Sequence, residues 1–201
     1  MIKAIVFGIG QIVLYENRTK MYKELAIKFR YDINKFKEVK DKYIDLAIKG
    51  QIDPKEFVKK IADELQIKNV DNYYENWLKL CEENTAINLD SIELIEKLGK
   101  NYTMVSFSNV NQLHNQVREK LNIYKYFKVN IVSFKEGMKK PDDQFYELLI
   151  KRLKLKPHEI LYIDDSETLV DPAKVTGMKT IQFKNNIQLK KELRELNIIG
   201  Y

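Results

Sequence analysis

Four short stretches of this chain carry side chains that could do chemistry, and each follows an apolar run. The stretches are Gly8-Ile9-Gly10-Gln11, Ser108-Asn109, Lys139-Lys140-Pro141-Asp142 and Asp164-Asp165-Ser166. A lysine and a hydroxyl group bind a phosphate, and paired carboxylates supply the hard oxygen ligands that Mg²⁺ prefers. Each stretch alone occurs by chance in many proteins. Their order along successive apolar runs is much more specific.

The apolar runs themselves predict the strands that would position these groups. They cover residues 2–7, 102–107, 128–134, 159–164 and 178–183. Each is almost continuously apolar at its centre, which is typical of a strand buried on both faces of a parallel sheet. Amphipathic stretches predict helices at 90–99, 110–121, 142–154, 167–176 and 187–196, and Gly99 and Gly177 mark two of the helix ends.

The alternation of strands and helices predicts a doubly wound α/β domain. In an open sheet of this kind, ligands bind at the carboxyl ends of the strands. We therefore expect the four polar stretches to converge on one crevice.

Residues 16–86 break this alternation. They show no convincing strand, and their apolar residues recur at helical spacing. Pro54 suits a first helical turn with Asp53 as N-cap, and the aromatic residues from Tyr73 to Trp77 are expected to pack inside a helical bundle. The sequence predicts a core of residues 1–15 and 87–201 with an inserted all-helical cap, 16–86.

The order of these motifs resembles the haloacid dehalogenase superfamily, of the type with a helical cap inserted after the first strand. The resemblance covers essentially all 201 residues. The second motif of the family matches Ser108, the third matches Lys140 rather than Lys139, and the fourth matches Asp164 and Asp165. The resemblance implies a Rossmann-like core and hydrolase chemistry of the phosphatase or dehalogenase type.

The resemblance also implies the roles of individual residues. Ser108 and Lys140 are implied as catalytic residues, and Ser108, Asn109 and Lys140 as substrate-binding residues. Asp164, Asp165 and the backbone carbonyl of Gly10 would be ligands of a magnesium ion.

The first motif departs from the family pattern. Gly8 stands where family members carry the nucleophilic aspartate, and Gly10 stands at the acid/base position. Covalent catalysis of this kind needs a carboxylate that attacks phosphorus or carbon, and glycine has none. The same carboxylate helps to hold Mg²⁺, so any metal site is expected to be weakened. No nearby residue convincingly replaces the missing nucleophile. Glu16 is expected on the cap side. Asp165 could activate a water molecule, but it would then have to serve as both base and metal ligand.

Some of these residues also have purely structural interpretations. Ser108 could cap the following helix, the two aspartates could cap another, and Lys140 could be a solvated surface lysine. His114 and His158 lack metal-ligand spacing and are expected at the surface. Cys81 fits a small core hydrophobe.

Composition limits the class of protein. Of the 201 residues, 44% are hydrophobic, 32% are charged and one is cysteine. A single cysteine excludes a disulfide scaffold or a cysteine zinc site. The apolar start is too short for a signal peptide, and no run reaches the roughly 18–20 residues of a membrane span. A cytoplasmic protein is expected.

The net charge of +6 leaves the partner open. The lysines are spread along the chain among acidic residues, which disfavours nucleic acid. The leading hypothesis is a hydrolase-fold protein that lacks its nucleophile, is inactive or strongly impaired, and retains a pocket for a phosphorylated or carboxylated small molecule. The alternatives are a working Mg²⁺-dependent phosphatase or dehalogenase-type hydrolase, and a basic module that binds protein or nucleic acid. A protein partner or a homodimer is compatible with each.

Overall fold

A five-stranded parallel sheet forms the centre of the molecule in a computed structural model that describes residues 1–198. Its strands are β1 (Ala4–Phe7), β4 (Thr103–Ser108), β5 (Val129–Val132), β6 (Ile160–Asp164) and β7 (Lys179–Gln182). They lie in the order β5-β4-β1-β6-β7, and all neighbours are parallel. The predicted fold class is confirmed, and the predicted strands differ from those observed by at most two residues at either end.

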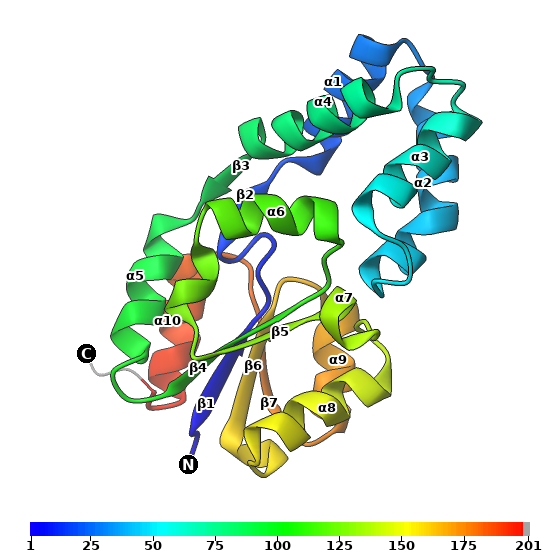
Figure 1. Ribbon diagram of the computed structural model, residues 1–201. Coiled ribbons are helices and arrows are strands. Elements are labelled where there is room, and N and C mark those ends of the chain that lie inside the picture. Colours follow the sequence, from blue (N-terminus) through cyan, green and yellow to red (C-terminus); the bar gives the residue numbers. More distant parts are fainter. Residues whose placement is uncertain (199–201) are drawn as a thin grey trace.

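Helices cover both faces of this sheet (Figure 1). The helices on these faces are α5 (Leu89–Leu98), α8 (Asp143–Leu153), α9 (Glu167–Val175) and α10 (Asn186–Glu195). Helix α6 (Gln112–Lys120) follows β4, and its Leu113 and Val117 pack with the helical segment that follows β1. Short turns complete the core: α7 (Ser133–Glu136), η1 (Ile123–Tyr126) and η2 (Pro157–Glu159). Because side chains alternate along a strand, β1 serves two cores. Ile5 and Phe7 pack with residues of α5 and α10, whereas Ala4 and Val6 pack with residues of α8 and α9.

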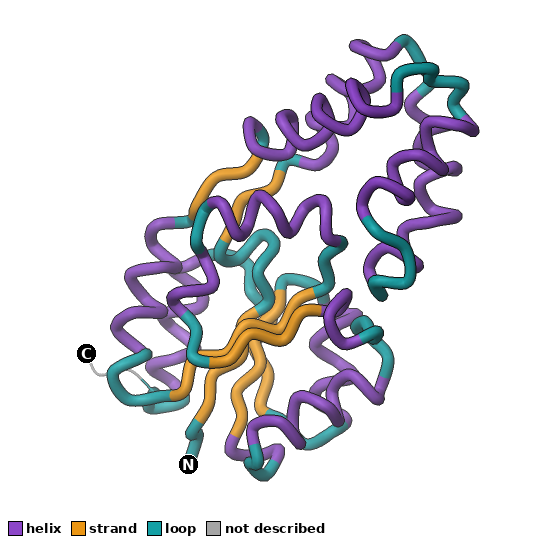
Figure 2. Tube along the Cα trace, in the orientation of Figure 1, coloured by secondary structure: helices purple, strands orange, loops and turns teal. Residues whose placement is uncertain are grey.

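The segment after β1 leaves the sheet and forms a helical bundle (Figure 2). It contains α1 (Arg18–Phe29), α2 (Ile33–Ile48), α3 (Pro54–Glu64) and α4 (Val70–Glu83). Asp53 caps α3 through the backbone N–H of Glu56, with Pro54 in the first turn, as predicted. Tyr73 and Trp77 are fully buried among aromatic neighbours, including Phe36 at 5.4 Å from Trp77 between ring centroids. The division into core and cap at residues 16 and 87 stays a prediction.

Two short strands connect the bundle to the core, and the expectation of no strand near the ends of this segment is wrong. β2 (Leu14–Glu16) and β3 (Thr85–Ile87) form an antiparallel ribbon in which Leu14 pairs with Ile87 and Glu16 pairs with Thr85. Three-residue strands are too short to show alternation, so the pattern of the sequence does not reveal them. The ribbon fixes the position of Glu16 relative to the sheet.

No helix within residues 1–198 is both long and apolar enough to cross a membrane.

The core of the helical bundle gives the first prediction. Trp77→Ala is expected to lower the free energy of unfolding by about 3–5 kcal/mol, because it opens a large cavity among buried rings. Ile27→Ala, at a position of α1 that is 77% exposed, should change it by less than about 0.5 kcal/mol. Urea denaturation of both variants measures this. Equal losses in the two variants would contradict the packing described.

Candidate functional site

One pocket lies at the carboxyl ends of β1, β4 and β6. It has a volume of about 250 Å³ and is lined by Gly8, Ile9, Gly10, Gln11, Glu16, Arg18, Ser108, Asn109, Arg118, Lys140, Asp164, Asp165 and Leu169. The structure therefore brings together every candidate site residue of the sequence analysis. It adds two arginines and Glu16, to which the sequence analysis gave no role in the site.

Lys140 is buried and forms an ion pair with Asp164. Its Nζ lies 2.5 Å from Asp164 Oδ2 and also donates hydrogen bonds to the Phe107 carbonyl oxygen and the Tyr162 hydroxyl. The Tyr162 hydroxyl in turn donates to the same Asp164 oxygen, at 2.5 Å. Asn109 fixes the backbone of Lys140, because its side chain bonds both the N–H and the carbonyl of that residue. The interpretation of Lys140 as a solvated surface lysine is wrong.

The two aspartates of the pocket differ in charge. Burial raises the pKa of Asp164, but the charge of Lys140 and hydrogen bonds from Lys140 and Tyr162 outweigh it, so the pKa of Asp164 lies below its ordinary value. Desolvation, together with the negative charge of Asp164, raises the pKa of Asp165 to about 6. Asp164 therefore stays ionised, whereas Asp165, with its pKa raised to about 6, is the weaker acid of the two.

The capping interpretations fail for Ser108 and for the aspartates. Helix α6 is capped by Asn111, whose side chain accepts from the backbone N–H of His114, and Ser108 ends β4 instead. Asp164 ends β6, and Ser166 occupies the N-cap position of α9.

A magnesium ion would find Asp164 already engaged by the protein, so Asp165 and the Gly10 carbonyl would be the main groups left to hold it. Asp164 Oδ2 already accepts from Lys140 and Tyr162, and its Oδ1 accepts from the Ser166 N–H at 3.3 Å. Gly8 and Gly10 offer no carboxylates. Within residues 1–198, no group of three or more His, Cys, Asp or Glu side chains is placed to hold a metal ion.

The space above Gly8 is filled by Asp164. A Cβ atom at position 8 would lie 2.6 Å from Asp164 Oδ2 and 3.1 Å from its Cγ. Real Cβ atoms do not approach oxygen this closely, so a side chain at position 8 requires Asp164 to move. The carboxylate of Asp164, at the end of β6, therefore lies directly against Gly8.

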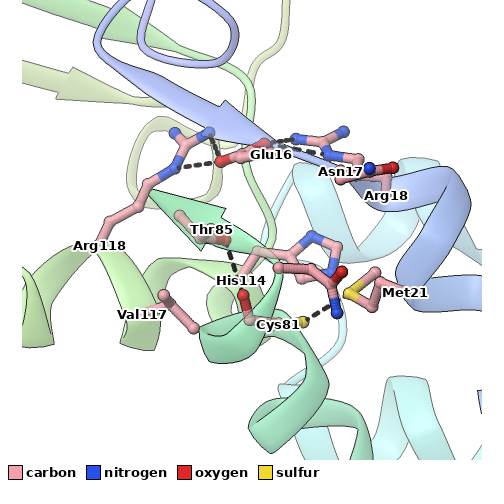
Figure 3. Close-up of a pocket in the computed structure, with 10 residues that line it drawn as sticks. Glu16, Asn17, Arg18, Met21, Cys81, Thr85, His114, Val117 and Arg118 are labelled. Carbon is pink, nitrogen blue, oxygen red and sulfur yellow. Dashed lines mark hydrogen bonds and ion pairs between the residues drawn. The ribbon is translucent and has the colours of Figure 1, made fainter. Parts of the chain in front are cut away.

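Glu16 lies in the pocket between two arginines, and the expectation did not foresee this place in the pocket. Its Oε1 accepts from Arg118 Nε and Nη2 at 3.2 and 2.8 Å, and its Oε2 accepts from Arg18 Nε and Nη2 at 3.0 and 2.6 Å (Figure 3). Arg118 also donates from Nη1 to Ser108 Oγ at 2.6 Å. A Cβ at Gly10 would lie 3.5 Å from Glu16 Oε2, so the carboxylate of Glu16 occupies the space beside Gly10.

The ion pairs keep Glu16 ionised. Burial raises its pKa, but the charges of Arg118 and Arg18 outweigh that effect and hold the pKa of Glu16 far below its ordinary value. A carboxylate this stable as an anion is a poor proton acceptor, because general base strength falls with pKa. Glu16 is a counterion rather than a substitute for the acid/base aspartate.

A second, small cavity of about 20 Å³ is also lined by Glu16 and both arginines (Figure 3). His114 lines it and is 9% exposed, so the expectation of a surface residue is wrong. The Nε2 of His114 has no hydrogen-bond partner within residues 1–198, and burial with the nearby arginine charges lowers the pKa of His114 to about 3. His158 is exposed as expected. Cys81 is buried with its Sγ 3.2 Å from Met21 Sδ, in agreement with the core interpretation.

The spacing of His114 and Arg118 is the signal that sequence reasoning missed. Residues four apart share one face of a helix, and both of these lie on the face of α6 that is turned toward the pockets. Arg118 is 2% exposed. A buried arginine needs a carboxylate partner, and for Arg118 this partner is Glu16.

Alanine substitutions separate the two glycines. Gly8→Ala is expected to lower the free energy of unfolding by about 1–3 kcal/mol, because its Cβ displaces a hydrogen-bonded Asp164. Gly10→Ala should change it by less than about 1 kcal/mol, because its Cβ meets only ordinary contacts. Urea denaturation checks both, and a neutral Gly8→Ala would show that Asp164 does not need this space.

His114 is expected to make the protein sensitive to mild acid. Because its pKa is about 3 in the fold and near its ordinary 6.5 when unfolded, only the unfolded chain takes up the proton as pH falls below 6.5. Stability is therefore lost with falling pH, by up to about 1.4 kcal/mol per pH unit. Asp165 acts in the opposite direction, since its raised pKa favours the fold as it protonates. The contribution of Asp165 to stability is the same in the native protein and in a His114 variant, so it cancels when the two are compared.

The measurement is urea denaturation of the native protein and of His114→Gln between pH 6.5 and 5. The variant should show the shallower loss. Parallel curves for the two proteins would contradict a neutral, buried His114.

Comparison with known proteins identifies the family. The family model for haloacid dehalogenase-like hydrolases matches residues 3–176. The chain is 25% identical over 213 aligned positions to D-ribitol-5-phosphate phosphatase from Bacteroides thetaiotaomicron, covering 96% of this chain and 97% of that protein. It is 31% identical over 123 residues to flavin mononucleotide hydrolase 1 from Arabidopsis thaliana, covering 60% of this chain. It spans 50% of the length of that relative and 13% of the bifunctional epoxide hydrolases it also matches.

Solved structures share the fold. A haloacid dehalogenase family enzyme from Bacteroides thetaiotaomicron superposes with a TM-score of 0.79 at 23% identity, covering 91% of this chain and 94% of that one. A HAD-like family hydrolase from Porphyromonas gingivalis superposes with a TM-score of 0.77 at 22% identity, covering 96% and 98%. With the family model matched over most of its length, this chain belongs to the haloacid dehalogenase-like hydrolase family.

Proposed function

We propose that this protein binds a phosphorylated or carboxylated small molecule in the pocket at the strand ends and hydrolyses it very slowly or not at all. The observation that carries this proposal is position 8. It has no side chain, and a Cβ atom there would lie only 2.6 Å from Asp164 Oδ2.

The other carboxylates of the pocket are poorly placed to replace the nucleophile. Asp164 is held by Lys140 and Tyr162, and both oxygens of Glu16 are bound by arginines. A carboxylate in such pairs is a weak nucleophile, because attack requires it to give up strong charge-assisted hydrogen bonds. Loss of a covalent nucleophile typically costs about 10⁴–10⁶ in rate.

The comparisons suggest which ligands to try first. Two relatives are named for the hydrolysis of phosphate monoesters, ribitol 5-phosphate and flavin mononucleotide. One related structure was determined in complex with magnesium and inorganic phosphate. A phosphate monoester is therefore the first ligand class to test, and any magnesium site here is expected to be weaker than in those relatives because the first-motif carboxylates are missing.

A second function, slow Mg²⁺-dependent phosphatase activity, is favoured by one observation. The pKa of Asp165 is raised to about 6, which suits a general base near neutral pH. In that case Asp165 would activate a water molecule for direct attack on phosphorus. A nucleic-acid or protein partner rests on net charge alone and stays a prediction.

A hydrolase panel distinguishes these functions. Phosphate monoesters and 2-haloacids are offered to the native protein, to Gly8→Asp and to Gly10→Asp, each with and without Mg²⁺. The native protein should show no turnover in the ordinary range of about 1–10³ s⁻¹. Gly8→Asp should gain Mg²⁺-dependent activity, by roughly tenfold rather than the full 10⁴, because Asp164 must first move aside.

Gly10→Asp is the matched control, since it adds the same charge to the pocket without a nucleophile at position 8. Its gain should be much smaller than that of Gly8→Asp, because an aspartate at the acid/base position cannot form the covalent intermediate. Ordinary turnover by the native protein would contradict the proposal. A rate that is slow, dependent on Mg²⁺ and abolished in Asp165→Asn would favour water attack.

A further inference from the structure

We propose that the pocket binds its anion without a divalent metal, through the guanidinium groups of Arg118 and Arg18, and that Glu16 is a built-in counterion which the ligand displaces. This inference rests on the proposed function only in placing the anion in this pocket.

The charge balance of the pocket is the first argument. Its lining contains three cations, Arg18, Arg118 and Lys140, and three carboxylates, Glu16, Asp164 and Asp165. Two further aspartates at positions 8 and 10 would add two negative charges, and a phosphate could then enter only with a cation to offset them. With glycine at both positions the fixed charges already balance, so a divalent ion is not required.

Lys140, the lysine that the resemblance assigns to the anion, is already fully engaged within the protein. Its ammonium group is bound by Asp164, Tyr162 and a backbone carbonyl. An ammonium group has three hydrogens, and all three are used within the protein. Lys140 contributes positive potential to the pocket, but it has no hydrogen left for a ligand.

Arg118 is the third argument. It reaches Ser108, the hydroxyl that the resemblance assigns to the anion, and Glu16 at the same time. The planar guanidinium group presents several donors in one fork, which matches two oxygens of a phosphate or carboxylate. Arg118 is buried, so the ligand finds it already desolvated and held in place.

Glu16 shows that this site recognises an anion. Its two carboxylate oxygens accept four hydrogen bonds from Arg118 and Arg18. Paired guanidinium groups around a carboxylate are the arrangement expected for an external carboxylate or phosphate ligand. Because Arg18 has a side chain that is 47% exposed, its contact to Glu16 can exchange for one to a ligand at the pocket mouth. Glu16 therefore lowers the affinity for anions by competing with them.

Calorimetric titration with inorganic phosphate tests this. The native protein is titrated in EDTA and, separately, in excess Mg²⁺, and the dissociation constants should agree within about twofold. Arg118→Gln and Arg18→Gln should each weaken phosphate binding by about tenfold or more, because each loses a charge-assisted contact. Glu16→Gln should tighten binding. Lys120→Gln, an exposed position on the same helix, should leave it unchanged.

Glu16→Gln leaves a buried arginine without its carboxylate and is at risk of not folding. Arg18→Gln removes a partly exposed side chain. It therefore keeps the test decisive if Glu16→Gln does not fold. Binding equal to the native protein in both arginine variants would overturn the inference.

The outcomes also separate this inference from the proposed function. Phosphate binding that requires Mg²⁺ overturns the inference and leaves the proposed function standing. The absence of binding by phosphate and by phosphate monoesters under both conditions overturns both. Ordinary turnover combined with metal-independent binding overturns only the proposed function.

Discussion

The buried ion pair between Lys140 and Asp164 is the constraint on which the rest of the site depends. Its carboxylate lies 2.6 Å from the point where a Cβ atom at position 8 would stand, so any side chain at position 8 requires Asp164 to move and the ion pair to adjust. Burying two charges is costly unless they are closely paired and hydrogen-bonded. Tyr162 and the Phe107 carbonyl meet that condition. Gly8 is thus packed tightly against a fully hydrogen-bonded ion pair.

A similar arrangement surrounds Gly10. There the carboxylate of Glu16, delivered by the short ribbon of β2 and β3, stands near the vacated position and is neutralised by arginines from α1 and α6. The carboxylate of Asp164 lies beside Gly8 and that of Glu16 beside Gly10. Both carboxylates are paired with basic side chains. In the pocket as a whole, three basic side chains face three carboxylates. Three cations in one pocket still give it the chemistry to hold an anion.

The sequence was sufficient for the sheet and for the pocket residues at its strand ends, because apolar strands buried on both faces leave an unmistakable pattern and topology then fixes where their ends meet. It was not sufficient for Glu16, Arg118 and His114. The main contact of Glu16 and Arg118 joins residues 102 positions apart, and His114 matters through the small cavity that it lines. The three-residue strands that bring Glu16 back to the sheet are too short to be read from the sequence. The sequence shows that position 8 has no carboxylate. Only the structure shows that Asp164 Oδ2 would lie 2.6 Å from a Cβ atom at that position.

Phosphorus NMR of a phosphate monoester incubated with the native protein tests the central claim most directly, since one spectrum reports both binding and hydrolysis. The account predicts that the monoester resonance shifts or broadens in EDTA as protein is added, and that no orthophosphate signal grows over hours, with or without Mg²⁺. Growth of orthophosphate at an ordinary enzymatic rate after addition of Mg²⁺ would contradict it, because a pocket without a nucleophile cannot sustain that rate.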